Sequence, residues 1–151
     1  MRHRVAGRGF GRNTNQRKAL LRGLIVSLFE HLKIETTVAK AKEAKKIAER
    51  IITFGKRGDL HSRRLALSRI PNKGIISKLF GDIAPKLTGR NSGYLRIVRT
   101  RNRPGDNSSM AILEFVDYEK LVEKKEEKKK EEKKEEKKKE EKKEEKKKTP
   151  S

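Results

Sequence analysis

All apolar residues of the chain lie before residue 123, and this segregation decides where a core can form. From Glu123 to Lys148 the chain consists of 11 glutamates and 15 lysines and nothing else. A segment without apolar side chains cannot bury enough surface to offset the entropy of ordering it. The sequence therefore predicts a basic arm over residues 1–12, one domain over 13–122 and a charged low-complexity tail over 123–151.

The order of charges in the tail is poorly suited to a single stable helix. Eight of the 11 glutamates have a lysine three residues later, but at four residues only three meet lysine and seven meet another glutamate. Like charges at that spacing destabilise a helix. We therefore expect a tail that is mostly disordered and only partly helical.

The first 122 residues carry 27 basic and 10 acidic side chains, a formal charge of +17. Such a domain repels itself unless a polyanion supplies the countercharge, which favours nucleic acid as the partner and an acidic membrane surface second. No apolar run is long enough for a membrane-spanning helix, and no apolar stretch follows the basic N-terminus as in a secretory signal. The lack of cysteine excludes disulfides and thiolate zinc sites and suits a reducing, cytoplasmic compartment.

Hydrophobic spacing predicts a domain of the α+β class. Asn13 and Gln16 have the spacing of a capping box, and Asp59 and Asn72 are suited to cap later helices. The turn-rich segment between the last two apolar runs indicates a hairpin. The expected elements are a helix from about Asn13, a strand over Ile34–Val38, a helix over about Ala39–Phe54, a short helix after Asp59, a helix after Asn72 that Pro85 and Gly89 close, and strands over Tyr94–Arg101 and Met110–Asp117.

Basic residues gather in three places that reach outward from this core. The arm contains Arg2, Arg4, Arg8 and Arg12 among three glycines, and no acid precedes Glu30. Guanidinium groups bind phosphate in a bidentate way and stack on bases, so we interpret the arm as folding against RNA. The alternative is a solvated, disordered terminus.

The early turns of the first helix hold Arg17, Lys18 and Arg22. Because a helix N-terminus disfavours cations, this placement fits a phosphate contact better than a role in stabilising the fold. The first hairpin strand and its exit hold Arg96, Arg99, Arg101 and Arg103, with no acid from Ala84 through Gly105. A basic hairpin can reach into folded RNA, and the alternative is an edge strand protected by charge.

Nothing in the sequence predicts catalysis. The histidines His3, His31 and His61 have no partners at metal-ligand spacing, so neither a metal nor a cofactor is expected. His61, beside Arg63 and Arg64, could assist phosphoryl chemistry, but such chemistry needs a second acid or base, and none is visible. Arg63 and Arg64 are counted among the expected RNA-binding residues. The glycines of the arm follow no strand and therefore do not form a phosphate-cradling fingerprint.

Five segments in order resemble the bacterial large-subunit ribosomal protein seventeen family. They read MRHR, NQRKALLRGLIVSL, ETTVAKAKEAKKIAERIIT, KLFGDIAPKL, and GYLRI followed by RPGDNSSMAILEFV. The similarity of each segment alone is modest, but the ordered set runs from Met1 to about Val116 and is specific for this family. The Glu/Lys tail lies outside this region.

The resemblance implies a compact domain of order α-β-α-α-α-β-β with a small mixed three-stranded sheet whose last strand is central. It also implies a structural, non-enzymatic component of the large ribosomal subunit in the cytoplasm. Such a protein binds large-subunit rRNA beside neighbouring ribosomal proteins, near the exit side of the peptide tunnel, with no membrane or small-molecule substrate. Family RNA-binding positions carried onto this sequence are Arg2, His3, Arg4, Arg12, Arg17, Lys18, Arg22 and Arg64.

Two other functions compete with rRNA binding. A general nucleic-acid compactor would coat DNA, and an RNA-processing enzyme would act on RNA. The arm and the hairpin favour rRNA binding, because both can enter irregular folded RNA. A DNA-coating protein more often shows a repeated basic face or a dimerisation helix.

Overall fold

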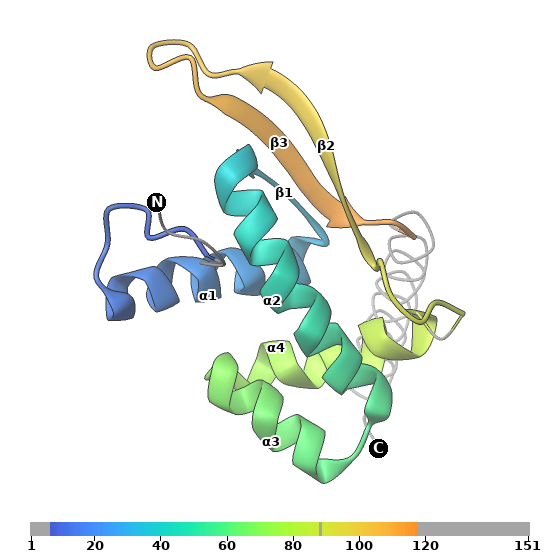
Figure 1. The fold of residues 1–151 in the computed structure, drawn as a ribbon. Helices are drawn as coiled ribbons and strands as arrows, with labels where there is room; N and C mark the ends of the chain where they lie inside the picture. Colours follow the sequence, from blue (N-terminus) through green and yellow to red (C-terminus); the bar gives the residue numbers. More distant parts are fainter. Residues whose placement is uncertain (1–6, 88, 118–151) are drawn as a thin grey trace, which may run out of the picture. The chain divides into compact units, whose positions relative to one another are not determined.

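The computed structural model describes residues 7–87 and 89–117 (Figure 1). The expected RNA contacts Arg2, His3 and Arg4, and the tail over 123–151, lie outside these residues. The predicted α+β class and element order are confirmed. The elements are α1 (Thr14–His31), β1 (Lys33–Thr37), α2 (Val38–Arg57), α3 (Leu60–Arg69), α4 (Lys73–Lys78), a π turn (Leu79–Ile83), a 3-10 turn (Ala84–Leu87), β2 (Leu95–Asn102) and β3 (Ser109–Phe115).

The three predicted helix caps are confirmed. The backbone N–H of Gln16 donates to Asn13 Oδ1 at 2.9 Å and the N–H of Asn13 donates back to Gln16 Oε1 at 3.4 Å, so the capping box is complete. Asp59 accepts from the N–H of Ser62, and Asn72 accepts from the N–H of Ile75. Hydrogen bonds from the Ser62 side chain and backbone lower the pKa of Asp59. Each cap satisfies backbone donors that a helix start would otherwise leave unpaired.

The sheet has the order β1-β3-β2, so the last strand is central as expected. The expectation of a mixed sheet is wrong, because β3 runs antiparallel to both neighbours. The physical reason lies in the connections. A hairpin loop over residues 103–108 joins β2 to β3, so these two strands are antiparallel. The strand β1 pairs with the free side of β3, again antiparallel, with Ile34 opposite Leu113.

The core forms where α2 lies across one face of the sheet (Figure 1). Ala41, Ala44 and Ala48 are fully buried on α2, and their small side chains allow the helix to approach its neighbours closely. Phe29 of α1 meets Phe115 of β3 with ring centroids 6.3 Å apart. Each fully buried side chain of this size contributes about 1.5–3 kcal/mol relative to leaving it in water.

The helix expected after Asn72 is shorter than predicted. Its α-helical part ends at Lys78, after which Ala84 donates its N–H to the Leu79 carbonyl, five residues back, and a 3-10 turn follows. Pro85 cannot donate a backbone hydrogen bond and crowds the carbonyl four residues before it, so a regular α-helix cannot continue through it. Val38, expected at the end of the first strand, instead begins α2.

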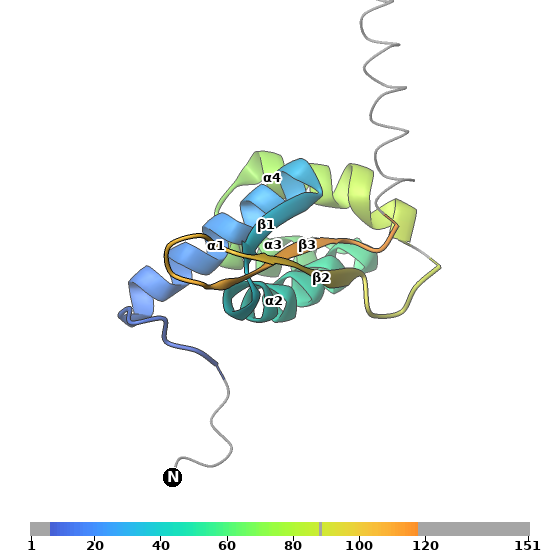
Figure 2. The ribbon, with the colours of Figure 1, turned by 90° about the horizontal axis from the view of Figure 1, so that it is seen from above.

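The β2–β3 hairpin extends past the helices, away from α3 and α4 (Figure 1). Seen from above, residues 7–12 leave the N-terminal end of α1 on the side of the hairpin tip (Figure 2). The arm and the hairpin, which are about 90 residues apart in the chain, therefore flank the same end of α2.

Candidate nucleic-acid interface

An open hollow of about 370 Å³ lies where the arm, the start of α2 and the hairpin meet. Three cations from these three elements line it: Arg8, Lys42 and Arg99. Ser108 and Ser109 from the hairpin add hydroxyl groups. No acidic side chain belongs to the described residues that line this hollow. The hollow therefore concentrates positive charge that few side chains of the domain neutralise. We call it the cationic hollow.

The backbone at the start of α2 adds to this positive potential. Thr37 is the N-cap residue, yet its side chain makes no capping hydrogen bond. Val38 and Ala39 line the hollow, and the first turn of α2 contains no acid. A helix N-terminus presents unpaired N–H groups and about half a positive charge. Backbone donors and guanidinium groups together form a favourable setting for a phosphate.

The strand register explains why Arg99 differs from the other hairpin arginines. Arg99 lies opposite Ala111, a buried residue, so it shares the face of the sheet that α2 covers. Near the N-terminal end of α2 this face is open, and Arg99 extends into the cationic hollow. The described residues contain no ion pair or hydrogen bond of its side chain.

The remaining predicted hairpin arginines have acidic partners. Arg96 Nε donates to Glu114 Oε1 at 2.6 Å, and Lys33 lies 3.7 Å from the other oxygen of this buried carboxylate. Arg101 lies 3.8 Å from Glu35. These carboxylates come from β3 and β1, which the run of basic residues along β2 does not reveal. β2 is an edge strand, which is consistent with the alternative that its charge protects an edge.

Arg103 is held at the hairpin tip. It donates from Nε and Nη2 to the two oxygens of Asp106, which also accepts from Ser108. The hydrogen bonds from Arg103 and Ser108 lower the pKa of Asp106 well below its usual range. The same contact raises the pKa of Arg103. This arginine therefore shapes the turn as well as adding charge to it.

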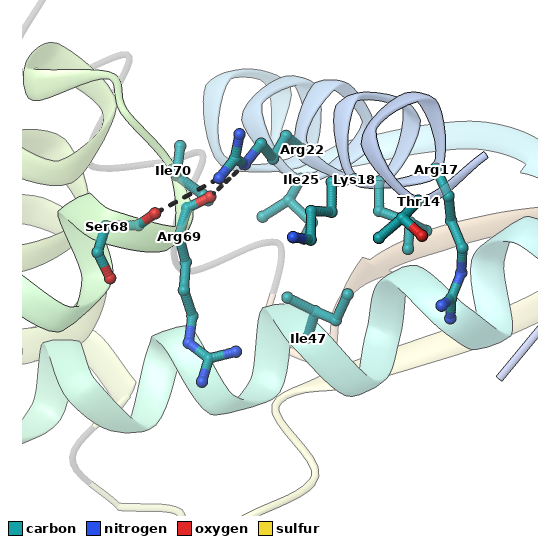
Figure 3. A pocket seen from close by; sticks show the side chains of 10 residues that line it. Thr14, Arg17, Lys18, Arg22, Ile25, Ile47, Ser68, Arg69 and Ile70 are labelled. Atoms are coloured by element: carbon teal, nitrogen blue, oxygen red, sulfur yellow. Dashed lines mark hydrogen bonds between the residues drawn. The ribbon is translucent and has the colours of Figure 1, made fainter. Parts of the chain in front are cut away.

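On α1, two of the three predicted contacts also stabilise the fold. Arg22 Nε donates to the carbonyl of Arg69 at 2.7 Å (Figure 3). Arg17 lies 3.6 Å from the buried carboxylate of Glu43. Arg17 and Arg22 therefore also contribute to the fold, and their expected phosphate contacts stay a prediction. Their partners are more than 25 residues away in the chain, so helix position alone did not reveal them. Lys18 is exposed, and the described residues contain no partner for it.

The α3 arginines lie far from the cationic hollow, since α3 and the hairpin tip occupy opposite ends of the domain (Figure 1). Arg63 packs over the Phe80 ring, 5.0 Å from its centroid. Arg64 is exposed on the same helix. Arg12, in the arm, donates to the carbonyl of Phe10. The structure thus joins Arg8 with Arg99 but does not bring all predicted contacts to one surface.

Lys42 was not predicted as a site residue. The available signal was a lysine in the first two turns of a long helix that directly follows a strand and has no acid in its first turn. In the part of the chain that the structure describes, no three His, Cys, Asp or Glu side chains come together as metal ligands. Over the same residues, no helix has both the length and the apolar character needed to cross a membrane.

Comparison with known proteins agrees with the resemblance noted above. The sequence pattern described as ribosomal protein L17 matches residues 20–116. The large ribosomal subunit protein bL17 of Thermodesulfovibrio yellowstonii is 60% identical over 120 residues, covering 80% of this chain and 90% of that protein. The proteins of the same name from Desulfotalea psychrophila and Mesorhizobium japonicum are 53% and 50% identical, covering 95% and 82% of their own lengths. Because the pattern and these relatives extend over most of the folded part, the chain belongs to the ribosomal protein L17 family.

Proposed function

We propose that this chain is a structural constituent of the bacterial large ribosomal subunit and binds large-subunit rRNA, with no catalytic role. The names of its relatives, which are large ribosomal subunit proteins, support this assignment. In this proposal the protein works in the cytoplasm, beside other ribosomal proteins, near the exit side of the peptide tunnel. Its partner is RNA rather than a membrane or a small-molecule substrate.

The observation that carries the proposal is the cationic hollow. Arg8, Lys42 and Arg99 converge there on the uncapped N-terminus of α2, with no acid among the described lining residues. A phosphodiester backbone supplies the countercharge that this arrangement lacks. The other proposed contacts are Arg2, His3, Arg4, Arg12, Arg17, Lys18, Arg22, Arg63, Arg64, Arg96, Arg101 and Arg103. Because Arg96, Arg101 and Arg103 already have acidic partners, we expect each to contribute less than Arg99.

Sedimentation of cell lysate through a sucrose gradient tests the assignment to the ribosome. The protein should migrate with large subunits at low salt and largely remain there at high salt. A pellet that disappears on DNase treatment would instead identify a DNA-coating protein. Migration at the top of the gradient under both conditions would contradict ribosomal assembly.

A matched pair of charge variants tests the cationic hollow. The double variant Lys42→Gln, Arg99→Gln removes two cations that line it, whereas Arg57→Gln, Lys73→Gln removes two exposed cations elsewhere. Arg57 is at the opposite end of α2, about 30 Å away for a helix of 20 residues. Each lost phosphate contact should reduce the slope of log affinity against log salt by about 0.7–0.9. Equal loss of affinity for large-subunit rRNA in the two double variants would show that the hollow has no special role.

A further inference from the structure

A second hollow, of about 260 Å³, lies between α1 and α2, beside the C-terminal end of α3 (Figure 3). Its floor is apolar and consists of Leu21 and Ile25 from α1, Ile47 from α2 and Ile70 after α3. Ile47 is only half-buried, and its side chain points into the gap (Figure 3). The volume is below the roughly 300–1,000 Å³ of pockets that hold drug-sized molecules, so it suits a single ring system. We call this hollow the α1–α2 slot.

Arg22 provides a planar group at the edge of the slot. Its guanidinium is held by the carbonyls of Arg69, at 2.7 Å, and Ser68, at 3.5 Å (Figure 3). These bonds fix the plane of the group and occupy its edge, not its faces. A guanidinium fixed in this way can stack on an aromatic ring without losing its existing partners.

Two elements bring positive charge to the slot. Lys18 belongs to α1 and Arg69 to the end of α3, and the described residues hold no acidic partner for either side chain. Glu43, the acid nearest this region, already faces Arg17 and Lys46. A ligand that is flat and apolar at its centre and negative on either side would therefore match the slot.

One buried donor at the slot also lacks a partner. The Nε atom of Arg17 is buried and makes no hydrogen bond to the described residues. Leaving a buried donor unpaired costs free energy, which an acceptor on a bound ligand would recover. The arm passes beside this arginine, since a Cβ placed on Gly7 would lie 2.8 Å from Arg17 Nη2. The arm, which is proposed to follow RNA, therefore lies close to Arg17, one of the residues that line the slot.

We infer that the α1–α2 slot binds one unstacked nucleobase of single-stranded RNA, with its two flanking phosphates on the Lys18 and Arg69 sides. This inference rests on the proposed function and specifies part of it. Sequence-specific RNA recognition commonly uses bases that leave the helical stack and lie on aromatic or guanidinium planes. An acidic peptide with one aliphatic side chain could pair with Lys18, Arg69 and the Arg17 donor, but it would leave the faces of the Arg22 guanidinium unused.

Methyl NMR of the full chain tests the inference directly. The probes are penta-adenylate and an abasic ribose-phosphate oligomer of the same length and charge. Only penta-adenylate should shift the methyl resonances of Ile25, Ile47 and Ile70, because only a base brings a ring current into the slot. Equal shifts with both oligomers, or no shift of these methyls with saturating penta-adenylate, would overturn the inference.

A plug variant provides a second, independent measurement. Ser68 is an exposed residue of the slot lining, and its Oγ donates within its own helix, to the Leu65 carbonyl. Ser68→Phe should weaken penta-adenylate binding roughly five- to tenfold, at the low end for loss of one stacked base. It removes no cation, so affinity for the abasic oligomer and its salt dependence should not change. Ser77→Phe, at an exposed serine of α4 outside the slot, is the matched control and should leave both affinities unchanged.

The outcomes separate this inference from the proposed function. If the slot methyls do not respond to penta-adenylate while the protein still migrates with large subunits, the slot is not a base site and the ribosomal assignment stands. If a glutamate peptide carrying one leucine shifts these methyls and penta-adenylate does not, the slot binds a protein segment and the inference is wrong. If the protein does not migrate with large subunits, the proposed function fails, whatever the slot binds.

Discussion

At the scale of single residues, Leu32 shows how burial can hold an unfavourable backbone. It ends α1 with φ of 66°, in the left-handed region, and donates its N–H to the Leu28 carbonyl at 2.7 Å. Helices more often place glycine in this conformation, because a Cβ there costs about 1–2 kcal/mol. The Leu32 side chain is 3% exposed, so its burial outweighs the strain.

At position 32 glycine should therefore destabilise the protein less than alanine, which reverses their usual order of stability in a helix. Both Leu32→Ala and Leu32→Gly lose the buried side chain and should reduce the free energy of unfolding by about 2–5 kcal/mol. Only glycine releases the backbone strain, so the glycine variant should be more stable than the alanine variant by about 1 kcal/mol. Urea denaturation measures the difference. A less stable glycine variant would show that the strain is small.

Asp106 makes the hairpin tip sensitive to acid. Hydrogen bonds from Arg103 and Ser108 lower its pKa in the folded protein, so the folded state binds fewer protons than the unfolded state as pH falls below about 4. The contribution of this carboxylate to stability is therefore complete above that pH and is lost as pH falls through the lowered pKa. Carboxyl resonances followed by NMR should show a midpoint for Asp106 below that of an ordinary aspartate. In Arg103→Gln the midpoint should rise, and a normal midpoint in the unaltered protein would contradict the assigned contacts.

At the scale of elements, α2 organises the domain because it contacts all three strands as well as α1 and α3. Its close approach to the turns after α4 depends on Gly55, which is buried. A Cβ at Gly55 would lie 3.2 Å from Ala84 Cβ and 3.3 Å from Leu79 Cγ. Gly23 on α1 is exposed, and a Cβ there would meet nothing within 4 Å.

The two helical glycines should therefore respond in opposite directions. Gly55→Val overpacks a close contact and should lower the free energy of unfolding by about 1–3 kcal/mol. Gly23→Ala gains helix propensity without a clash and should raise it by about 0.5–1 kcal/mol. Thermal and urea unfolding of the two variants measure both effects. A stabilising Gly55→Val would mean that α2 and the turns after α4 can move apart easily.

At the scale of the whole molecule, the charge is separated from the core. The described arm residues over 7–12 are almost entirely exposed, and no buried core side chain belongs to them. Arg8 nevertheless lines the cationic hollow together with α2 and the hairpin. The arm therefore adds to the surface proposed to bind RNA, while the helices and the sheet supply the stability.

Deleting residues 1–11 should separate these two roles. The truncated protein should keep its helical circular dichroism, because no described core residue is removed and Asn13 still caps α1. It should lose incorporation into large subunits in a reconstitution assay, because it lacks Arg2, Arg4 and Arg8 of the arm. Unfolding of the truncated protein would show that the arm supports the core. Normal incorporation would show that the arm is passive.

The sequence by itself determined the features that depend on near neighbours. Capping at Asn13, Asp59 and Asn72 is a contact over three residues, and helix and hairpin positions follow from periodicity and turn residues. These interactions are local, so a linear pattern contains both partners. The family could also be recognised, because an ordered set of such segments is specific even where each one is not.

Only the tertiary structure decided which arginines are available and where hollows form. Arg96 meets an acid 18 positions away, and Arg22 meets a carbonyl 47 positions away, so the sequence near either residue contains no sign of its partner. The antiparallel pairing of β1 with β3 likewise joins residues that are far apart in the sequence. The cationic hollow likewise needs the arm, α2 and the hairpin to meet at one point. Such contacts depend on how the whole chain packs, because they form between surfaces that do not exist until the elements have assembled.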